Sequence, residues 1–430
     1  MRPTDDNAPL NISTSLPRRG FLQTGPLLAA ALAMPALPAQ AADRWTATWG
    51  AAPAGPPPSA STMSLSNQTL RLVVHASVAG SRVRIRISNE MGSVPLNIGA
   101  ARIALRSSGA VTVAGTDRQL LFGGRSSVTI AAGAAVLSDG ADFNVPPFAD
   151  LAVSLYLPGT SRLTTLHNAA LQTSYVSTAG DRSALQSLPV QRTISTWPFL
   201  TEVDVSGPYS GLNALQSVVA LGDSITDGQA STANANRRWP DMLARRLQLE
   251  GGVAANIGVA NRGISANSLL KDYPEAMLAG QRALLRFDRD VAATSDVRWM
   301  IALIGINDIV YSSASSPIPA DSLINGHQQL IAKARARGIK PIGATLTPFE
   351  GHGYYTAARG NVRKRLNEWM RAWPRGSGAY DAVVDFDLAL RDPTRPTRLR
   401  ATYDSGDHLH PNNAGYQAMA QAVPLTLFDG

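Results

Sequence analysis

Cysteine is absent from the 430 residues of the sequence, and charged and aromatic residues are few, at 16% and 6%. Without cysteine no disulfide can form, so the stability of the fold must come from the burial of its core. Hydrophobic residues reach 44%, which is typical of a globular chain and argues against disorder. The length is sufficient for two domains.

No long uninterrupted apolar run marks the N-terminal region. The stretch at residues 26–37 is too short to span a bilayer comfortably, and Pro35 interrupts it. Arg18 and Arg19 precede this stretch, and residues 39–41 follow it as an A-x-A cleavage signal. We therefore predict that residues 1–41 are a twin-arginine-type signal peptide and that the protein is exported, to the periplasm or the extracellular space. Stable membrane insertion is not expected.

Acidic residues are the minority among the charges, with 31 Asp and Glu against 39 Lys and Arg, and the net charge is +8. The basic residues form no consecutive block of the kind that marks an interaction tail. We interpret the excess as a solvated basic surface and expect no nucleic-acid partner. The sequence does not indicate an oligomeric state.

The first half of the sequence has the periodicity of β-strands. Apolar residues alternate with arginine at residues 83–87 and with polar or aromatic residues at 153–157, which is the pattern of a half-buried antiparallel strand. Gly-rich turns separate such runs at short intervals. These features predict an all-β sandwich, resembling a jelly roll, over residues 42–208.

The second half has a different pattern. Apolar runs at residues 215–221, 299–304, 339–346 and 382–386 have the length of strands buried on both faces. Amphipathic segments lie between or after them, at residues 321–337 and 412–427, with Asn412 or Asn413 as a candidate cap for the last helix. Alternating strands and helices predict an α/β domain with a parallel sheet over residues 209–430.

The segment Gly222-Asp223-Ser224 follows the first of these buried strands, at the sheet edge where active sites are usually built. A catalytic serine needs a base, an acid that orients the base, and donors for an oxyanion. Asp407 and His410 are three residues apart, so one turn can hold the carboxylate against the imidazole ring. The Asn307 amide and the backbone N–H of Gly263 are candidate oxyanion donors.

In sequence order, the Gly222-Asp223-Ser224 motif, Gly263, Asn307 and the Asp407/His410 pair resemble the four motifs of the SGNH hydrolases, also called GDSL esterases and lipases. The resemblance covers roughly residues 218–428. It implies a flavodoxin-like, three-layer α/β/α domain with Ser224 as nucleophile, His410 as base and Asp407 as its acid. It also implies an oxyanion hole formed by the N–H groups of Ser224 and Gly263 and by the Asn307 side chain. The first half is similar to the β-sandwich that precedes the catalytic domain in some secreted members.

Several other residues have simpler interpretations. Asp227 and Asp308 are expected to hold loops, with Asp227 as a candidate cap for the helix after the serine. His352 is at most a residue of the pocket rim. His408 and His410 form a His-x-His pair that can bind a metal, but no further ligands can be assigned. We therefore expect neither a metal nor a cofactor.

The predicted function is that of a secreted serine esterase that hydrolyses carboxylic esters through an acyl-enzyme, with short acyl or acetyl esters, including those on a polysaccharide, as the leading substrates. Three alternatives stay open. They are a lipase or lysophospholipase-type hydrolase of longer acyl esters, a carbohydrate-binding protein with weak esterase activity, and a metal-dependent hydrolase.

Overall fold

The computed structural model describes residues 44–55, 62–207, 214–273, 279–372 and 378–429. Within the chain, Asp43–Gly430 is one compact unit, separate from Met1–Ala42. The predicted signal peptide at 1–41 and the predicted domain boundary between residues 208 and 209 lie outside the described residues.

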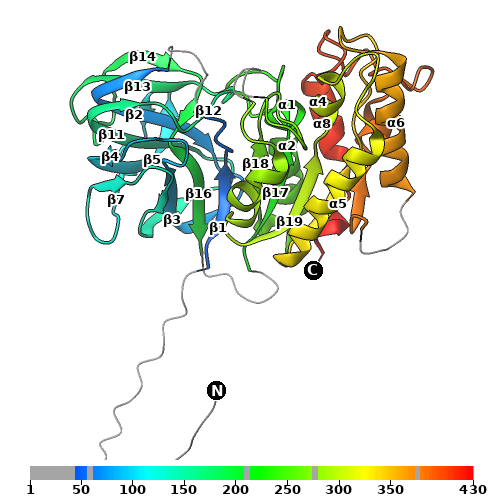
Figure 1. Cartoon of the computed structure of the whole chain (residues 1–430). Helices are drawn as coiled ribbons and strands as arrows, with labels where there is room; N and C mark the ends of the chain where they lie inside the picture. The colour runs from blue at the N-terminus through cyan, green and yellow to red at the C-terminus, as the bar shows by residue number, and fades with distance from the viewer. Residues whose placement is uncertain (1–43, 56–61, 208–213, 274–278, 373–377, 430) are drawn as a thin grey trace, which may run out of the picture. The chain divides into compact units, whose positions relative to one another are not determined.

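The described residues up to Ser206 form antiparallel sheets (Figure 1). One larger sheet has the order β1-β16-β3-β10, with β9 on β3, and the other has the order β14-β13-β2-β11-β5-β6, with β7 on β5. Two small sheets pair β12 with β15 and β4 with β8. The bounds are β1 (Thr46–Gly50), β2 (Ser64–His75), β3 (Gly80–Ser88), β4 (Leu96–Ile98), β5 (Ala100–Ser108), β6 (Val111–Thr112), β7 (Arg118–Leu120), β8 (Val128–Ile130), β9 (Ala135–Leu137), β10 (Ala141–Val145), β11 (Asp150–Arg162), β12 (Leu166–His167), β13 (Ser174–Ala179), β14 (Val190–Ile194), β15 (Trp197–Pro198) and β16 (Leu200–Ser206).

The strands predicted at residues 83–87 and 153–157 lie within β3 and β11. On β3 the apolar side chains Val83, Ile85 and Ile87 are fully buried, in the same hydrophobic cluster as apolar residues of the other large sheet. The alternation therefore places one face of β3 in a core that both sheets share.

The later residues form a parallel five-stranded sheet with the order β18-β17-β19-β20-β21. Among the helices around it, α2 packs beside α8 and α5 beside α6 (Figure 1). The strand bounds are β17 (Gln216–Gly222), β18 (Ile257–Gly263), β19 (Val297–Leu303), β20 (Lys340–Ala344) and β21 (Ala382–Val384). The helices are α1 (Ser224–Asp227), α2 (Trp239–Glu250), η2 (Ala254–Asn256), α3 (Ala283–Phe287), η3 (Asp288–Ala292), α4 (Ile306–Val310), α5 (Ala320–Ala336), α6 (Ala357–Arg371), α7 (Phe386–Leu390), α8 (Asn413–Ala422) and η4 (Leu425–Phe428).

The predicted strands of this half correspond to β17, β19, β20 and β21, and the helix predicted at 321–337 corresponds to α5. The prediction omitted β18, which lies at the edge of the sheet beside β17. It also made the last helix too long. Asn412 caps α8, but the helix ends before Pro424, which has no N–H to continue it, and a short 3₁₀ turn follows.

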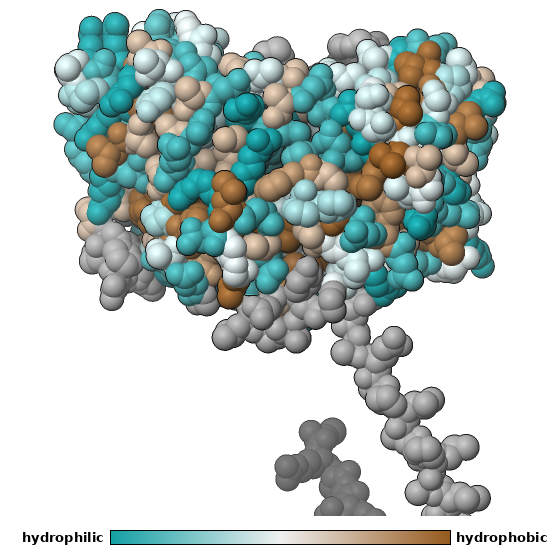
Figure 2. Space-filling view, turned by 180° about the vertical axis from the view of Figure 1, so that it is seen from behind, coloured by the Kyte–Doolittle hydropathy of each residue, from teal (hydrophilic) through white to brown (hydrophobic). Residues whose placement is uncertain are grey.

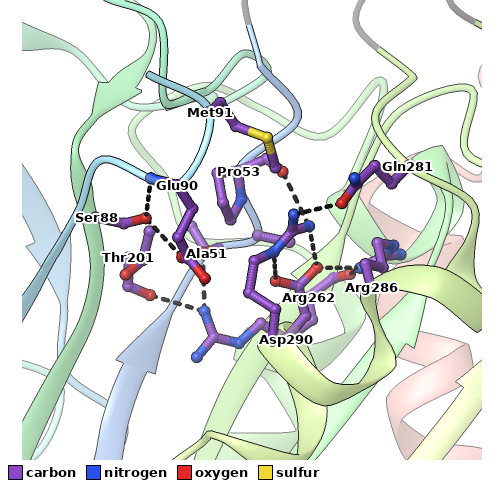
Figure 3. Close-up of polar contacts among 12 residues, drawn as sticks. Ala51, Pro53, Ser88, Glu90, Met91, Thr201, Arg262, Gln281, Arg286 and Asp290 are labelled. Atoms are coloured by element: carbon purple, nitrogen blue, oxygen red, sulfur yellow. Dashed lines mark hydrogen bonds and ion pairs between the residues drawn. The ribbon is translucent and has the colours of Figure 1, made fainter. Parts of the chain in front are cut away.

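Buried charges connect β18 to the antiparallel strands. Arg262 on β18 is only 2% exposed and forms an ion pair with Glu202 on β16, whose side chain is fully buried. The same guanidinium donates to the carbonyl oxygens of Ala51, at 2.8 Å, and Thr201, at 2.7 Å (Figure 3). The parallel sheet and the antiparallel strands are thus joined by a buried ion pair and hydrogen bonds as well as by apolar contact.

On the face shown in Figure 2, hydrophobic residues are scattered among hydrophilic ones. Among the residues that the structure describes, no helix combines the length and the apolar character needed to cross a membrane.

Replacing Arg262 by Met should reduce the free energy of unfolding by about 3–5 kcal/mol, because the buried carboxylate of Glu202 loses its close partner. Urea-induced unfolding followed by circular dichroism measures this loss. The control is Arg365→Met, which breaks an exposed pair with Asp321 and should cost less than about 1 kcal/mol. Equal losses in the two variants would contradict a special role of the buried pair.

Candidate active site

Ser224 lies at the carboxyl end of β17, an inner strand of the parallel sheet. It is the first residue of α1, a helix of only four residues. The Oδ1 atom of Asp223 accepts a hydrogen bond from Ile225 N–H at 3.0 Å, so Asp223 caps this helix and the sequence-based assignment of the cap to Asp227 is wrong. The turn after β17 thereby presents the serine at the edge of the sheet.

The structure brings Ser224, His410 and Asp407 together in one hydrogen-bonded chain. The Oγ atom of Ser224 lies 2.8 Å from Nε2 of His410, and Nδ1 of His410 lies 2.5 Å from Oδ2 of Asp407. An ionised carboxylate only accepts, so Nδ1 carries the proton and Nε2 is free to accept from the serine hydroxyl. This is the order of groups that a serine nucleophile, a general base and an orienting acid require.

The Asp407 carboxylate is held in its ionised form. Its partial burial opposes ionisation, but the hydrogen bond from the His410 ring and those from the backbone N–H groups of His410 and Leu409 outweigh this effect. The pKa of Asp407 is therefore well below its usual value. Asp407 stays charged at any pH at which the imidazole can act as a base.

Two of the three predicted oxyanion donors are compatible with their role. As the first residue of α1, Ser224 has a backbone N–H without a partner inside the helix. Asn307 lies in the first turn of α4, just after β19, which is the neighbour of β17. One hydrogen of the Asn307 amide is donated to the carbonyl oxygen of Asn267 at 2.8 Å, which fixes the side chain and leaves the second hydrogen.

The structure does not support the third predicted donor, Gly263. Its N–H donates to Oδ1 of Asn261 at 2.8 Å, so this group is already engaged. The glycine has another purpose. A Cβ atom at this position would lie 2.2 Å from the backbone nitrogen of Asp227, so only glycine allows the end of β18 to touch α1.

Sequence reasoning missed a buried arginine behind the site. Arg286 on α3 is fully buried and donates to the carbonyl oxygen of Gly222 at 2.9 Å, directly before the nucleophile turn. It also donates to the Arg262 carbonyl at 2.8 Å and to Oδ1 of Asn267 at 3.0 Å. Because Asn267 in turn holds Asn307, one guanidinium positions both the nucleophile turn and an oxyanion candidate.

The counter-charge of Arg286 is Asp290, which is 1% exposed (Figure 3). Burial opposes ionisation of Asp290, but Arg289, Arg286 and Arg262 outweigh it and hold its pKa below the usual value. The spacing of Arg286 and Asp290, four residues apart in one helical segment, is the one signal that could have revealed this pair.

Asp308, beside Asn307, holds the loop that follows β18. Its carboxylate accepts from the N–H groups of Leu269, at 2.7 Å, and Leu270, at 2.9 Å, in agreement with the loop-holding role expected for it. Burial raises the pKa of Asp308 to about 6, against these hydrogen bonds.

Aromatic rings flank the site. Tyr311 lies at the end of α4, and its ring centroid is 5.3 Å from that of Tyr273 and 6.0 Å from that of Tyr354. The ring centroids of Tyr354 and His352 are 5.5 Å apart. Burial lowers the pKa of His352, and the nearby carboxylate of Asp407 opposes this shift. His352 therefore lies beside the triad, as a residue of the rim.

His408 does not share a partner with His410. Its Nδ1 atom lies 2.6 Å from Oδ2 of Asp404, while His410 faces Ser224. Within the described ranges, no group of three or more His, Cys, Asp or Glu side chains is arranged to hold a metal ion.

Comparison with known proteins identifies the class of this domain. Residues 220–418 match the GDSL-like lipase/acylhydrolase family. Similar solved structures include a protein from Desulfitobacterium hafniense assigned to the G-D-S-L lipolytic family, with 25% identity, a TM-score of 0.36, and coverage of 48% of this chain and 97% of that one. An acetyl xylan esterase, AlAXEase, has 19% identity, a TM-score of 0.36, and coverage of 48% and 96%. The aryl esterase of M. smegmatis has 17% identity, a TM-score of 0.35, and coverage of 48% and 95%. A comparison with curated proteins found no match.

The parallel sheet and the residues at its edge therefore belong to a hydrolase that acts on esters. More particularly, the chain carries a GDSL-like lipase/acylhydrolase domain at residues 220–418.

Asp223 gives this domain a testable pH dependence. The Oδ2 atom of Asp223 is buried without a hydrogen-bond partner among the described residues, and burial raises the pKa of the carboxyl to about 7. Between about pH 4 and about pH 7 the folded state then binds more protons than the unfolded state, so this group lowers the free energy of unfolding as pH rises.

The variant Asp223→Asn keeps an acceptor for Ile225 N–H but cannot ionise. Its free energy of unfolding, relative to the wild type, should rise by a few kcal/mol across this pH window. Urea unfolding at several pH values measures the difference. Parallel stability profiles of the two proteins would show that Asp223 does not titrate in this range.

Proposed function

We propose that the protein is an exported serine esterase that cleaves carboxylic esters through an acyl-enzyme. The observation that carries the proposal is the hydrogen-bonded chain from Ser224 Oγ through His410 to Asp407, with distances of 2.8 and 2.5 Å. The GDSL-like domain match supports an ester as the substrate.

In the proposed mechanism, Nε2 of His410 takes the proton of Ser224 as Oγ attacks the ester carbonyl carbon. The Ser224 N–H and the Asn307 side chain donate to the oxyanion that develops. The proton on His410 then passes to the alcohol oxygen, which leaves, and the acyl group stays on Ser224. A water molecule, deprotonated by the same imidazole, attacks the acyl carbon. The bond from this carbon to Ser224 Oγ then breaks, Oγ takes the proton back from His410, and the acid leaves.

We further propose short acyl or acetyl esters, including acetyl groups on a polysaccharide, as the substrate class. The aromatic rim supports this choice, because Tyr311 and Tyr354 are 36% and 52% exposed beside the triad. Exposed rings with apolar faces and polar edges suit a ligand that carries both C–H and hydroxyl groups.

The export and domain assignments made from the sequence are also part of the proposal. We propose residues 1–41 as a signal peptide for export, residues 42–208 as a β-sandwich accessory domain, and residues 209–430 as a flavodoxin-like catalytic domain. The two large antiparallel sheets with one shared hydrophobic core support the second of these assignments, and the five-stranded parallel sheet supports the third.

Replacing Ser224 by Ala should reduce the initial rate on p-nitrophenyl acetate at least about a thousandfold, because the nucleophile is removed. The exposed Ser313 provides the matched control, and Ser313→Ala should keep the wild-type rate. Circular dichroism shows whether both variants are folded. A folded Ser224→Ala protein with an unchanged rate would overturn the proposed function.

The chain-length profile separates the esterase from its alternatives. Rates on p-nitrophenyl acetate, butyrate and octanoate should fall as the acyl chain grows, whereas a lipase-type enzyme would prefer octanoate. A chelator should leave the rate unchanged, whereas a metal-dependent hydrolase would lose activity. A carbohydrate-binding protein with weak esterase activity would bind polysaccharide but hydrolyse all three esters slowly.

The rim can be tested separately through Tyr354→Ala. Loss of a stacking surface should lower kcat/KM on an acetylated polysaccharide about three- to tenfold. The small substrate p-nitrophenyl acetate does not need the rim, so its kcat/KM serves as the control and should stay unchanged. Equal effects on the two substrates would argue against a glycan substrate.

A further inference from the structure

A histidine from the antiparallel strands reaches the helix that carries the nucleophile. His167 on β12 is 4% exposed, and its Nε2 atom lies 2.9 Å from Oδ1 of Asp227, the last residue of α1. Its Nδ1 atom lies 2.9 Å from the carbonyl oxygen of Ala52. Both ring nitrogens of His167 are therefore engaged.

Asp227 connects this histidine to the rest of the site. Its second carboxylate oxygen, Oδ2, accepts from the N–H of Ser265 at 3.0 Å and from the Ser265 hydroxyl at 2.8 Å, in the loop after β18. The backbone carbonyl of Asp227 accepts from Nε of Arg238 at 2.8 Å. The end of α1 is thus tied to three separate segments of the chain.

We propose that His167 is a positioning residue of the esterase: through Asp227 it holds α1 in the orientation that keeps Ser224 within reach of His410. This inference rests on the proposed function. It assigns to the antiparallel strands a part in the hydrolysis itself, rather than in substrate binding alone. Nothing in the triad motifs indicates it, because His167 is 60 residues away from Asp227 in the sequence.

The protonation state of His167 follows from its two partners. The Ala52 carbonyl only accepts, so Nδ1 must carry a proton, and an ionised Asp227 requires a second proton on Nε2. Burial disfavours this charged ring, and the charge of Arg238 does so too, but Asp227 and the Ala52 carbonyl outweigh them and raise the pKa of His167.

Among the described residues, His75 and Asp241 are further titratable groups that line the same cavity as His167. As pH rises through the raised pKa, the ring loses one proton and one of its two bonds becomes a contact between two acceptors. The contact between His167 and Asp227 should then orient α1 less firmly, and kcat should fall at alkaline pH.

The test compares three variants of the full-length protein. His167→Leu removes both donors, and His167→Gln restores a donor toward Asp227 without a titratable ring. The matched control is His75→Gln. His75 lines the same cavity and forms a similar pair with Asp150, at 2.8 Å, but this pair does not include a residue of α1. Circular dichroism and thermal unfolding monitor the fold of each variant.

The readouts are kcat and KM for p-nitrophenyl acetate between pH 5 and pH 9, measured below each unfolding temperature. His167→Leu should lower kcat about ten- to a hundredfold with KM nearly unchanged, since displacing the nucleophile affects the chemical step. His167→Gln should recover part of kcat and lose the alkaline decline of the wild type. The control His75→Gln should retain the wild-type kcat and pH profile.

The inference is overturned if His167→Leu has the same kcat as the control, or if His167→Gln keeps the alkaline decline. If His167→Leu does not fold, His167→Gln alone decides through its pH profile. A failure of this inference can be distinguished from a failure of the proposed function. An inactive Ser224→Ala protein together with a fully active His167→Leu protein refutes only the role of His167, whereas an active Ser224→Ala protein refutes both.

Discussion

The site depends on holding in place a helix of four residues. An isolated helix of one turn is unstable in water, because the few hydrogen bonds it forms do not offset the entropy of fixing its backbone. In this protein α1 carries Ser224, and its stability comes from outside. Asp223 caps its start, Arg286 binds the carbonyl of Gly222 before it, and β18 contacts its backbone at Gly263. The geometry of the serine is therefore a property of these neighbours more than of α1 itself.

Buried charged side chains help to hold this arrangement in place. Arg262, Arg286 and Asp290 are each 2% exposed or less, and each forms hydrogen bonds or ion pairs inside the protein. Such groups cost much free energy to desolvate, and they tolerate only conformations in which every partner is present. In a chain without cysteine, this network gives a directional constraint that apolar packing does not provide.

The sequence allowed the parallel sheet and the triad candidates to be located, because both depend on local patterns. Buried strands read as continuous apolar runs, and Asp407 and His410 are separated by one turn. The strand β18 was missed because two glycines and the polar residues Asn261 and Arg262 interrupt its apolar pattern. The burial of this arginine becomes favourable only with Glu202 beside it.

The same reason explains why the engagement of the Gly263 N–H was not foreseen. The motif suggested an open backbone N–H, but the neighbouring Asn261 side chain occupies it, and the space beside the glycine is filled by α1. Local spacing could not reveal either contact. Arg286 was overlooked since its partners Gly222 and Asn267 lie in other segments of the chain. The catalytic roles of the triad and the acyl specificity remain predictions, because they concern substrates rather than packing.

The pairing of β1 with β16, and the contact of β1 with β18, have a consequence for the order of folding during synthesis. Because the ribosome releases the N-terminus first, about 150 further residues must be synthesised before β16 can pair with β1. Synthesis must continue further before Arg262, the counter-charge of Glu202, is present. A nascent chain halted between these points would carry an open sheet edge, and Glu202 would have Arg86, at 3.7 Å, but not its close partner Arg262. The antiparallel half should thus stay loosely ordered until β18 has emerged, which makes maturation of the whole molecule a late and concerted event.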